Sequence, residues 1–244
     1  MPDWIEPDWS APARVRALST TRRGGVSSGR WESLNLGDHV EDDPQAVAEN
    51  RRLLVREAGL PAEPLWLKQV HGCAVADPAR DARGCEADAA FADAPGRVCA
   101  VMTADCLPVL LTNRAGTRVA AAHAGWRGLA GGVLEQTVRS FSDAPQALIA
   151  WLGPAIGPQA FEVGDEVREA FVSLHAASEA AFSSARPGHW YADIYALARN
   201  HLAAAGVTQV HGGGLCTFSD SERFFSYRRD GHTGRMASLV MIVP

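Results

Sequence analysis

The sequence lacks the features that mark membrane, secreted and nucleic-acid-binding proteins. None of its apolar runs approaches the ~18 residues that a membrane span needs. The N-terminal segment, residues 1–18, has acids where a secretion signal has a basic stretch followed by an apolar one. No basic tract or basic amphipathic stretch is present, and the formal charge of −5 is spread along the chain. We therefore expect no nucleic-acid partner and no membrane partner.

Cysteine is also scarce and irregularly placed. The chain has five cysteines, an odd number, and no CxxC pair. This pattern fits neither a disulfide framework nor a structural zinc knuckle. We expect a cytoplasmic protein with reduced thiols.

The bulk composition is that of a folded protein. The 244 residues are 47% hydrophobic and long enough for one large domain or two small ones. Because we find no internal repeat, low-complexity segment or long linker, we expect a single domain over residues 1–244.

Hydrophobic patterning predicts a mixed α/β (α+β) fold, with layered mixed sheets covered by helices. A plain doubly wound sheet is less favoured, because the strands cluster and the helices are few. The helix at 42–60 has Val47, Leu54 and Ala58 on one face and Gly59 at its end. Asp193 is the expected N-cap of the last helix and Gly206 its stop. The segments are strands at 14–21, 64–72, 97–113, 147–153 and 235–243, and helices at 42–60, 129–141, 163–175 and 193–206.

Two histidines stand at predicted strand ends. His71 closes "LWLKQVHG" and His123 closes "RVAAAHAG", each with a glycine close behind. Such positions face shared pockets, where sites are commonly built. We expect the histidines on predicted helices or in polar loops to be structural or solvated, namely His175, His189, His201 and His232.

Cys106 completes a candidate metal set. It lies beside Asp105 in the otherwise apolar "VMTADCLPVLL". One thiolate and two imidazoles form a zinc-type ligand set, and three protein ligands with an open fourth position are typical of catalytic zinc. Asp105 needs compensation from a cation or a histidine N–H, because burying an unpaired charge is costly. Two alternatives stay open: Cys106 as a nucleophile activated by His71 or His123, and purely structural roles for all three.

A phosphate-sized anion would suit the turn after His123. Gly125 and Gly128 allow close backbone approach, and the following helix directs free N–H groups to the same place. Cationic side chains that could join this site are Lys68, Arg127, Arg228, Arg229 and Arg235. The alternative is that these are solvated surface charges.

Six ordered fragments between residues 34 and 242 resemble the YfiH family, which is also labelled a laccase-domain or polyphenol-oxidase family. They are "NLGDHVEDDPQAVAENRRLL", "LKQVHG", "TADCLPVLL", "AAHAGWRGLAGGVLE", "GPAIGPQAFEVGDEV" and "CTFSDSERFFSYRRDGHTGRMASLVMI". The resemblance implies a YfiH-like, cysteine-hydrolase-like fold and zinc held by His71, Cys106 and His123. It also implies phosphorolysis of adenosine, inosine, guanosine and methylthioadenosine, and deamination of adenosine.

The resemblance leaves several functions open. The first is a zinc-dependent purine nucleoside phosphorylase that takes purine nucleosides and phosphate, with Asp105 orienting a ligand or moving a proton. The alternatives are a cysteine amidase that edits peptidoglycan precursors, a weak polyphenol oxidase with adventitious copper, and a non-catalytic binding protein. We expect a monomer or a weak homo-oligomer.

Two sequence features narrow these functions. A multicopper centre is rejected, because such centres depend on H-x-H pairs and the eight histidines form none. Many relatives have cysteine after "IGP", whereas this chain has Gln159 and Ala160, which excludes a second cysteine centre there.

Overall fold

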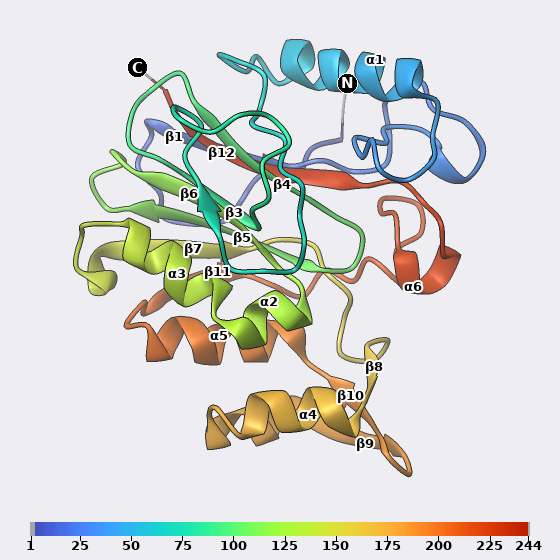
Figure 1. The fold of residues 1–244 in the computed structure, drawn as a ribbon, viewed down its shortest axis with the longest axis vertical. Coiled ribbons are helices and arrows are strands. Elements are labelled where there is room, and N and C mark those ends of the chain that lie inside the picture. The colour runs from blue at the N-terminus through green and yellow to red at the C-terminus, as the bar shows by residue number, and fades with distance from the viewer. Residues whose placement is uncertain (1–2, 244) are drawn as a thin grey trace.

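The computed structural model describes residues 3–243, and two β-sheets lie between two layers of helices (Figure 1). The smaller sheet is antiparallel and has the order β1-β12-β4. The larger sheet is mixed and has the order β11-β7-β5-β6-β3-β2. The strands of the smaller sheet are Val15–Ser19 (β1), Met236–Ile242 (β12) and Val98–Thr103 (β4). Those of the larger sheet are Gln209–Gly212 (β11), Leu148–Leu152 (β7), Leu107–Asn113 (β5), Val119–Ala124 (β6), Ala89–Ala92 (β3) and Val75–Ala76 (β2).

The central strands β4, β5 and β6 are apolar on both faces because both faces are covered. In β4, Cys99 and Val101 pack toward the larger sheet, while Val98, Ala100 and Met102 pack toward the outer helix. The same alternation runs through β5 and β6, whose two faces contribute to different cores. A two-residue period with both faces buried produces near-continuous hydrophobic runs.

The outer helix α1, Pro44–Glu57, covers the smaller sheet. Asp43 caps it by accepting a hydrogen bond from the Gln45 N–H at 2.9 Å. Leu54 and the following Ala58 pack into the core on this side. The amphipathic helix predicted at 42–60 is therefore confirmed.

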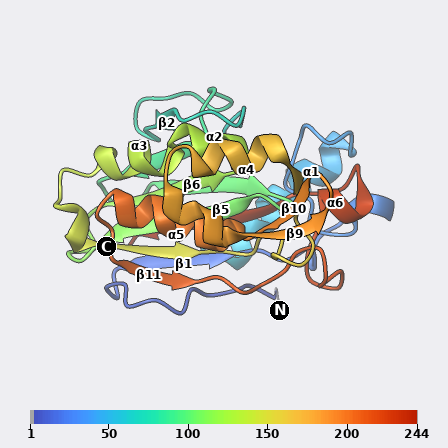
Figure 2. The same cartoon turned by 90° about the horizontal axis from the view of Figure 1, so that it is seen from below.

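Three helices cover the opposite face of the larger sheet: α2 (Trp126–Gly131), α3 (Val133–Ser140) and α5 (Ile194–Ala204). Seen from below, they lie in front of β5 and β6 (Figure 2). The prediction of one helix at 129–141 was wrong, because Gly132 adopts φ 95° and separates α2 from α3. The predicted cap is confirmed: Asp193 accepts hydrogen bonds from the N–H groups of Tyr195 and Ala196.

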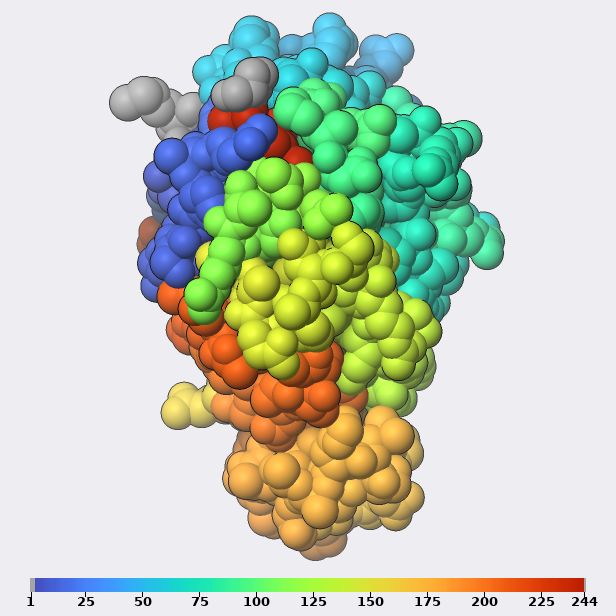
Figure 3. All heavy atoms as spheres, turned by 90° about the vertical axis from the view of Figure 1, so that its left-hand side faces the viewer, coloured from blue at the N-terminus to red at the C-terminus, as the bar shows by residue number. Residues whose placement is uncertain are grey.

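A small lobe projects from one end of the molecule. Its antiparallel sheet, β8-β10-β9, packs with α4 and the 3-10 helix η3, and Figure 3 shows it as the orange bulge below the main body. The predicted helix at 163–175 shortens to α4, and the sequence did not reveal the three strands. The lobe elements are Glu162–Gly164 (β8), Asp165–Val172 (α4), Ala176–Ala181 (η3), Phe182–Arg186 (β9) and His189–Ala192 (β10).

Two predicted strands need correction. Segment 64–72 forms only an isolated bridge between Lys68 and Glu86. Segment 97–113 is divided between the two sheets as β4 and β5. The remaining short helices are Gly29–Trp31 (η1), Pro145–Ala147 (η2) and Tyr227–Asp230 (α6). None of the helices within residues 3–243 combines the length and apolar character that a bilayer crossing requires.

Candidate active site

The pairing of β5 with β6 brings Cys106 close to His123. These strands are antiparallel, with Leu107 opposite Ala124, so β5 begins where β6 ends. Cys106 directly precedes β5, and His123 lies one residue before the end of β6. The sheet register therefore positions a thiol and an imidazole at one edge.

His71 reaches the same place through a loop that a buried carboxylate holds. Asp88, fully buried before β3, accepts hydrogen bonds from the N–H groups of Val70, His71 and Gly72 at 3.1, 2.9 and 2.7 Å. Successive N–H groups around one anion form a nest, and they hold His71 at φ 59°. Asp88 Oδ1 also lies 2.8 Å from His123 Nδ1. One carboxylate thus orients both histidines.

The three side chains have the geometry of a metal centre. Cys106 Sγ lies 3.9 Å from His71 Nε2, and the ligand atoms of His71, Cys106 and His123 all lie within 4.8 Å of one another. Ligands on one tetrahedral zinc ion are ~3.5 Å apart. A Cβ at Gly125 would lie 3.0 Å from Cys106 Sγ and 2.8 Å from His71 Cδ2, so glycine keeps this space open. The donor set and spacing fit zinc.

The electrostatics favour a thiolate. Burial alone would raise the pKa of Cys106, but the charge and hydrogen bonds of His123, together with His71, lower it to about 6. Burial would lower the pKa of His123, whereas Cys106 and Asp88 raise it to about 9. An ionised sulfur is the form that binds metal and attacks electrophiles.

Asp105 lies in the short connection between β4 in the smaller sheet and β5 in the larger sheet. The chain leaves β4 at Thr103 and enters β5 at Leu107, and Asp105 turns it with φ 94°. Its carboxylate accepts hydrogen bonds from Thr217 Oγ1 and the Arg228 N–H, both at 2.7 Å. The direct donors are thus a hydroxyl and a backbone N–H, while the expected cation is Arg235, whose charge interacts with Asp105 without a hydrogen bond.

A pocket of about 490 Å³ opens onto this cluster. Its wall combines the metal-type ligands with apolar side chains and three arginines. Arg127 packs on the Trp126 ring, 4.3 Å from its centroid, and Arg228 Nη1 donates to the Glu162 carbonyl at 2.8 Å. The lining side chains that bear on function are His39, Gln69, Asp105, Arg127, Ile156, Phe161, Ile194, Tyr227, Arg228 and Arg235.

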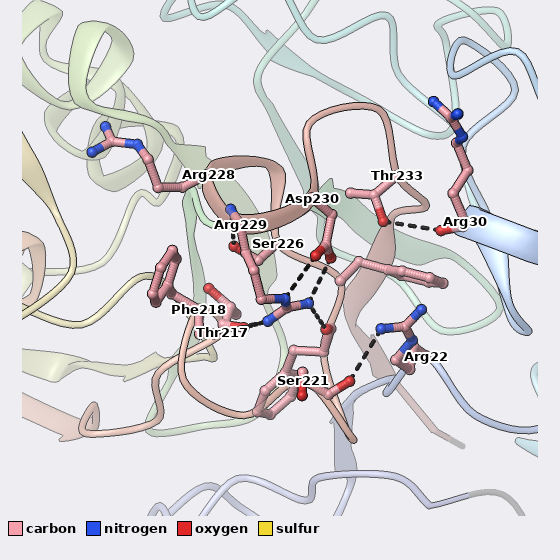
Figure 4. A network of polar contacts seen from close by, with 12 residues as sticks. Arg22, Arg30, Thr217, Phe218, Ser221, Ser226, Arg228, Arg229, Asp230 and Thr233 are labelled. Carbon is pink, nitrogen blue, oxygen red and sulfur yellow. Dashed lines mark hydrogen bonds and ion pairs between the residues drawn. The ribbon is translucent and has the colours of Figure 1, made fainter.

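Two predicted anion-binding residues lie elsewhere. Lys68 Nζ pairs with Glu86 at 2.8 Å in an exposed ion pair and does not line the pocket. Arg229 points into its own loop, where it donates to the carbonyls of Thr217, Phe218 and Phe224 and pairs with Asp230. Figure 4 shows the Arg228 side chain extending the opposite way. The helix after Gly125, which was expected to direct free N–H groups to an anion, is the six-residue α2.

Sequence reasoning missed Asp88, Gln69 and His39. Gln69 exchanges two hydrogen bonds with the Met102 backbone, which fixes the loop before His71 to β4. Asp88 carries a readable signal, since it is an acid directly before the apolar run Ala89–Ala92. A buried charge in that position requires several donors, and those donors are the site's own loop.

Mixed sheets between helices, with a His/Cys/His cluster in the wall of a pocket, define a mixed α/β protein with a candidate metal-binding site. Residues 16–243 match the family described as multi-copper polyphenol oxidoreductase laccase, and the chain belongs to that family. It is 62% identical to the Pseudomonas aeruginosa purine nucleoside phosphorylase PA4543 over 98% of both chains. It is 56% identical to the Escherichia coli purine nucleoside phosphorylase YfiH, again over 98% of each.

Solved structures agree with this assignment. The crystal structure of Neisseria meningitidis protein NMB0706 superposes with a TM-score of 0.96 at 50% identity, covering 99% of this chain and 100% of that one. The expected YfiH-family membership and fold are confirmed.

Proposed function

We propose that this chain is a zinc-dependent purine nucleoside phosphorylase that also deaminates adenosine. Its substrates would be phosphate with adenosine, inosine, guanosine or methylthioadenosine. One observation carries the proposal: His71, Cys106 and His123 meet in the wall of a pocket that is both apolar and cationic. The names of the Pseudomonas aeruginosa and Escherichia coli relatives support the phosphorylase class.

The chain's own residues would bind and orient the reactants. His71, Cys106 and His123 would hold zinc, which supplies Lewis-acid activation of water or of a phosphate oxygen. Arg127 and Arg228 would bind phosphate. In phosphorolysis a phosphate oxygen bonds to C1′ of the ribose, the C1′–N9 bond breaks, and its electron pair leaves with the purine. In deamination water oxygen bonds to C6 and ammonia leaves.

Other pocket residues would set orientation and polarity. Arg235 is a third cation for phosphate, in place of Lys68 and Arg229, and Phe161, Ile156 and Ile194 offer an apolar wall for the purine. Because both Asp105 oxygens already accept hydrogen bonds, its role would be to orient Cys106.

A cysteine amidase that edits peptidoglycan precursors is the second candidate. The lowered pKa of Cys106, with His71 Nε2 3.9 Å away, also suits a nucleophile and its base. A multicopper oxidase is not proposed, since the chain has no H-x-H pair. Adventitious copper at the same three ligands would account for weak polyphenol oxidation.

Metal content and product analysis separate these functions. Adenosine is incubated with the purified protein, with and without phosphate, and the products are separated by chromatography. Phosphate-dependent adenine or hypoxanthine with ribose 1-phosphate supports phosphorolysis, and inosine supports deamination. We expect Cys106→Ser to bind one equivalent of zinc fewer than the unmodified protein and to lose both activities, while Cys85→Ser, which replaces a cysteine outside the pocket, keeps them.

Two results would overturn the assignment. The first is a Cys106→Ser protein that binds as much zinc as the unmodified protein, together with no nucleoside turnover by the unmodified protein. The second is amide hydrolysis that survives chelation and disappears on alkylation of Cys106, which would favour the amidase.

A further inference from the structure

A second cluster of ligand-type side chains lies between the helix layer and the small lobe. Glu135 is in the first turn of α3, His201 is in the last turn of α5, and His175 follows α4. Their ligand atoms all lie within 4.8 Å of one another. None of the three lines the 490 Å³ pocket, so this cluster is separate from the candidate active site.

The contacts within the cluster are close, and His201 at its centre is buried. His201 Nδ1 lies 2.7 Å from Glu135 Oε1, and their side chains are 2% and 23% exposed. The rings of His175 and His201 meet edge-on, with centroids 5.1 Å apart. Phe171 packs edge-on against His201 at 5.7 Å and helps to exclude water.

The ion pair between Glu135 and His201 does not satisfy all the polar atoms of these two side chains. Within residues 3–243, five buried side-chain N or O atoms have no hydrogen-bond partner. Two of them are Glu135 Oε2 and His201 Nε2, and two more, Arg168 Nε and Ser178 Oγ, belong to the adjoining α4 and η3. Because buried polar groups are normally satisfied, the unpaired atoms of Glu135 and His201 indicate that this pair has a missing partner.

We propose that Glu135, His175 and His201 form a second metal site, suited to zinc. Two imidazoles and one carboxylate are a known zinc ligand set, with a fourth position left for water. A divalent cation bound between the three side chains would compensate the charge of the partly buried Glu135 carboxylate. Copper(II) would bind the same donors more tightly than zinc.

The site would fasten the lobe to the main body. His175 belongs to the lobe, whereas Glu135 and His201 belong to the helices on the large sheet. The lobe begins at Glu162, whose carbonyl accepts the Arg228 hydrogen bond beside Phe161 in the pocket wall. A metal here therefore holds the segment that shapes one side of the pocket.

Zinc binding to a protein that lacks the first site is the direct test. Cys106→Ala is dialysed against buffered free zinc, and bound metal is measured by mass spectrometry. We expect one equivalent to remain, and Cys106→Ala/His175→Ala to bind none. The matched control, Cys106→Ala/His189→Ala, replaces another partly exposed lobe histidine and should keep the equivalent.

A second measurement does not depend on any variant being folded. Crystals of the unmodified protein soaked in zinc should show anomalous density between Glu135, His175 and His201. Zinc should also slow amide hydrogen exchange of α4 and η3 in the unmodified protein. The proposal is overturned if Cys106→Ala binds no zinc, or if the only anomalous density lies at His71, Cys106 and His123, and the cluster is then a buried Glu–His pair.

Discussion

At the scale of single residues, Asp88 links the parts of the candidate metal centre. Its carboxylate accepts hydrogen bonds from three backbone N–H groups of the His71 loop and contacts the Nδ1 of His123. Such partners of metal-binding histidines fix the ring orientation and increase ligand basicity. Burial would raise the pKa of Asp88, but the hydrogen bonds from His123 and the loop lower it below its usual value.

Replacing Asp88 with Asn should weaken zinc binding. The amide keeps the size but loses the charge and the ability to accept from every donor, so we expect a roughly 10–100-fold loss of affinity. The zinc affinity of the folded variant is measured by competition with a chromophoric chelator. Asp93→Asn, at an exposed aspartate paired with Arg97, is the control and should bind normally. Equal affinities for the two variants would contradict the role of Asp88.

Cys106 should react with iodoacetamide at unusually low pH once zinc is removed. The thiolate is the reactive form, so the rate rises with pH through a pKa of about 6 and is level above it. Burial raises the pKa of Cys73 and Cys85, which should react only in alkaline solution. Peptide mass spectrometry across pH separates the sites, and zinc should protect Cys106. A midpoint near the ordinary thiol value of about 8.5 would refute the thiolate.

At the scale of elements, the ends of helices and strands depend on glycines with left-handed backbone and on the points where the chain passes from one sheet to the other. The spacing of apolar residues identified α1, α5 and the strands at both ends of the chain. Each of these segments has a continuous apolar pattern, and both helices begin after an aspartate N-cap. The same period cannot show that 97–113 crosses between sheets, because both halves are equally apolar. It also cannot reveal that φ at Gly132 divides a helical stripe.

Gly132→Ala should destabilise the fold. A Cβ there would meet only Glu135 Oε2 at 3.5 Å, so the cost arises from the left-handed backbone and not from crowding. We expect a loss of about 1 kcal/mol in the free energy of unfolding, measured in urea. Gly132→Asn should lose less, since Asn tolerates this conformation. An Ala variant as stable as the unmodified protein would show that the α2–α3 junction adapts without cost.

At the scale of the whole molecule, the candidate active site depends on how the two sheets are stacked. His71, Cys106 and His123 come from a loop, a sheet crossing and a strand end, and no local spacing relates them. Sequence chemistry selected the three residue types, but only the sheet register and the Asp88 nest bring them together. The cluster of Glu135, His175 and His201 could not be anticipated, because two of its residues lie on separate helices and His175 lies in the connection after α4.

Widening the gap between the sheets should therefore weaken both the fold and the metal centre. Ala121 is fully buried in β6 and packs toward the smaller sheet, two residues before His123 on the same face. Ala121→Leu should lower the free energy of unfolding by about 1–3 kcal/mol, because a close-packed core resists added volume.

The same variant tests whether the sheets position the metal ligands. Zinc affinity should fall as β6 moves relative to the crossing that carries Cys106, whereas Ala203→Leu, on the exposed side of α5, should change neither quantity. Urea unfolding and zinc competition give the two values for each variant. Destabilisation with unchanged zinc affinity would mean that the loop and the strand ends hold the metal ligands independently of the sheet stacking.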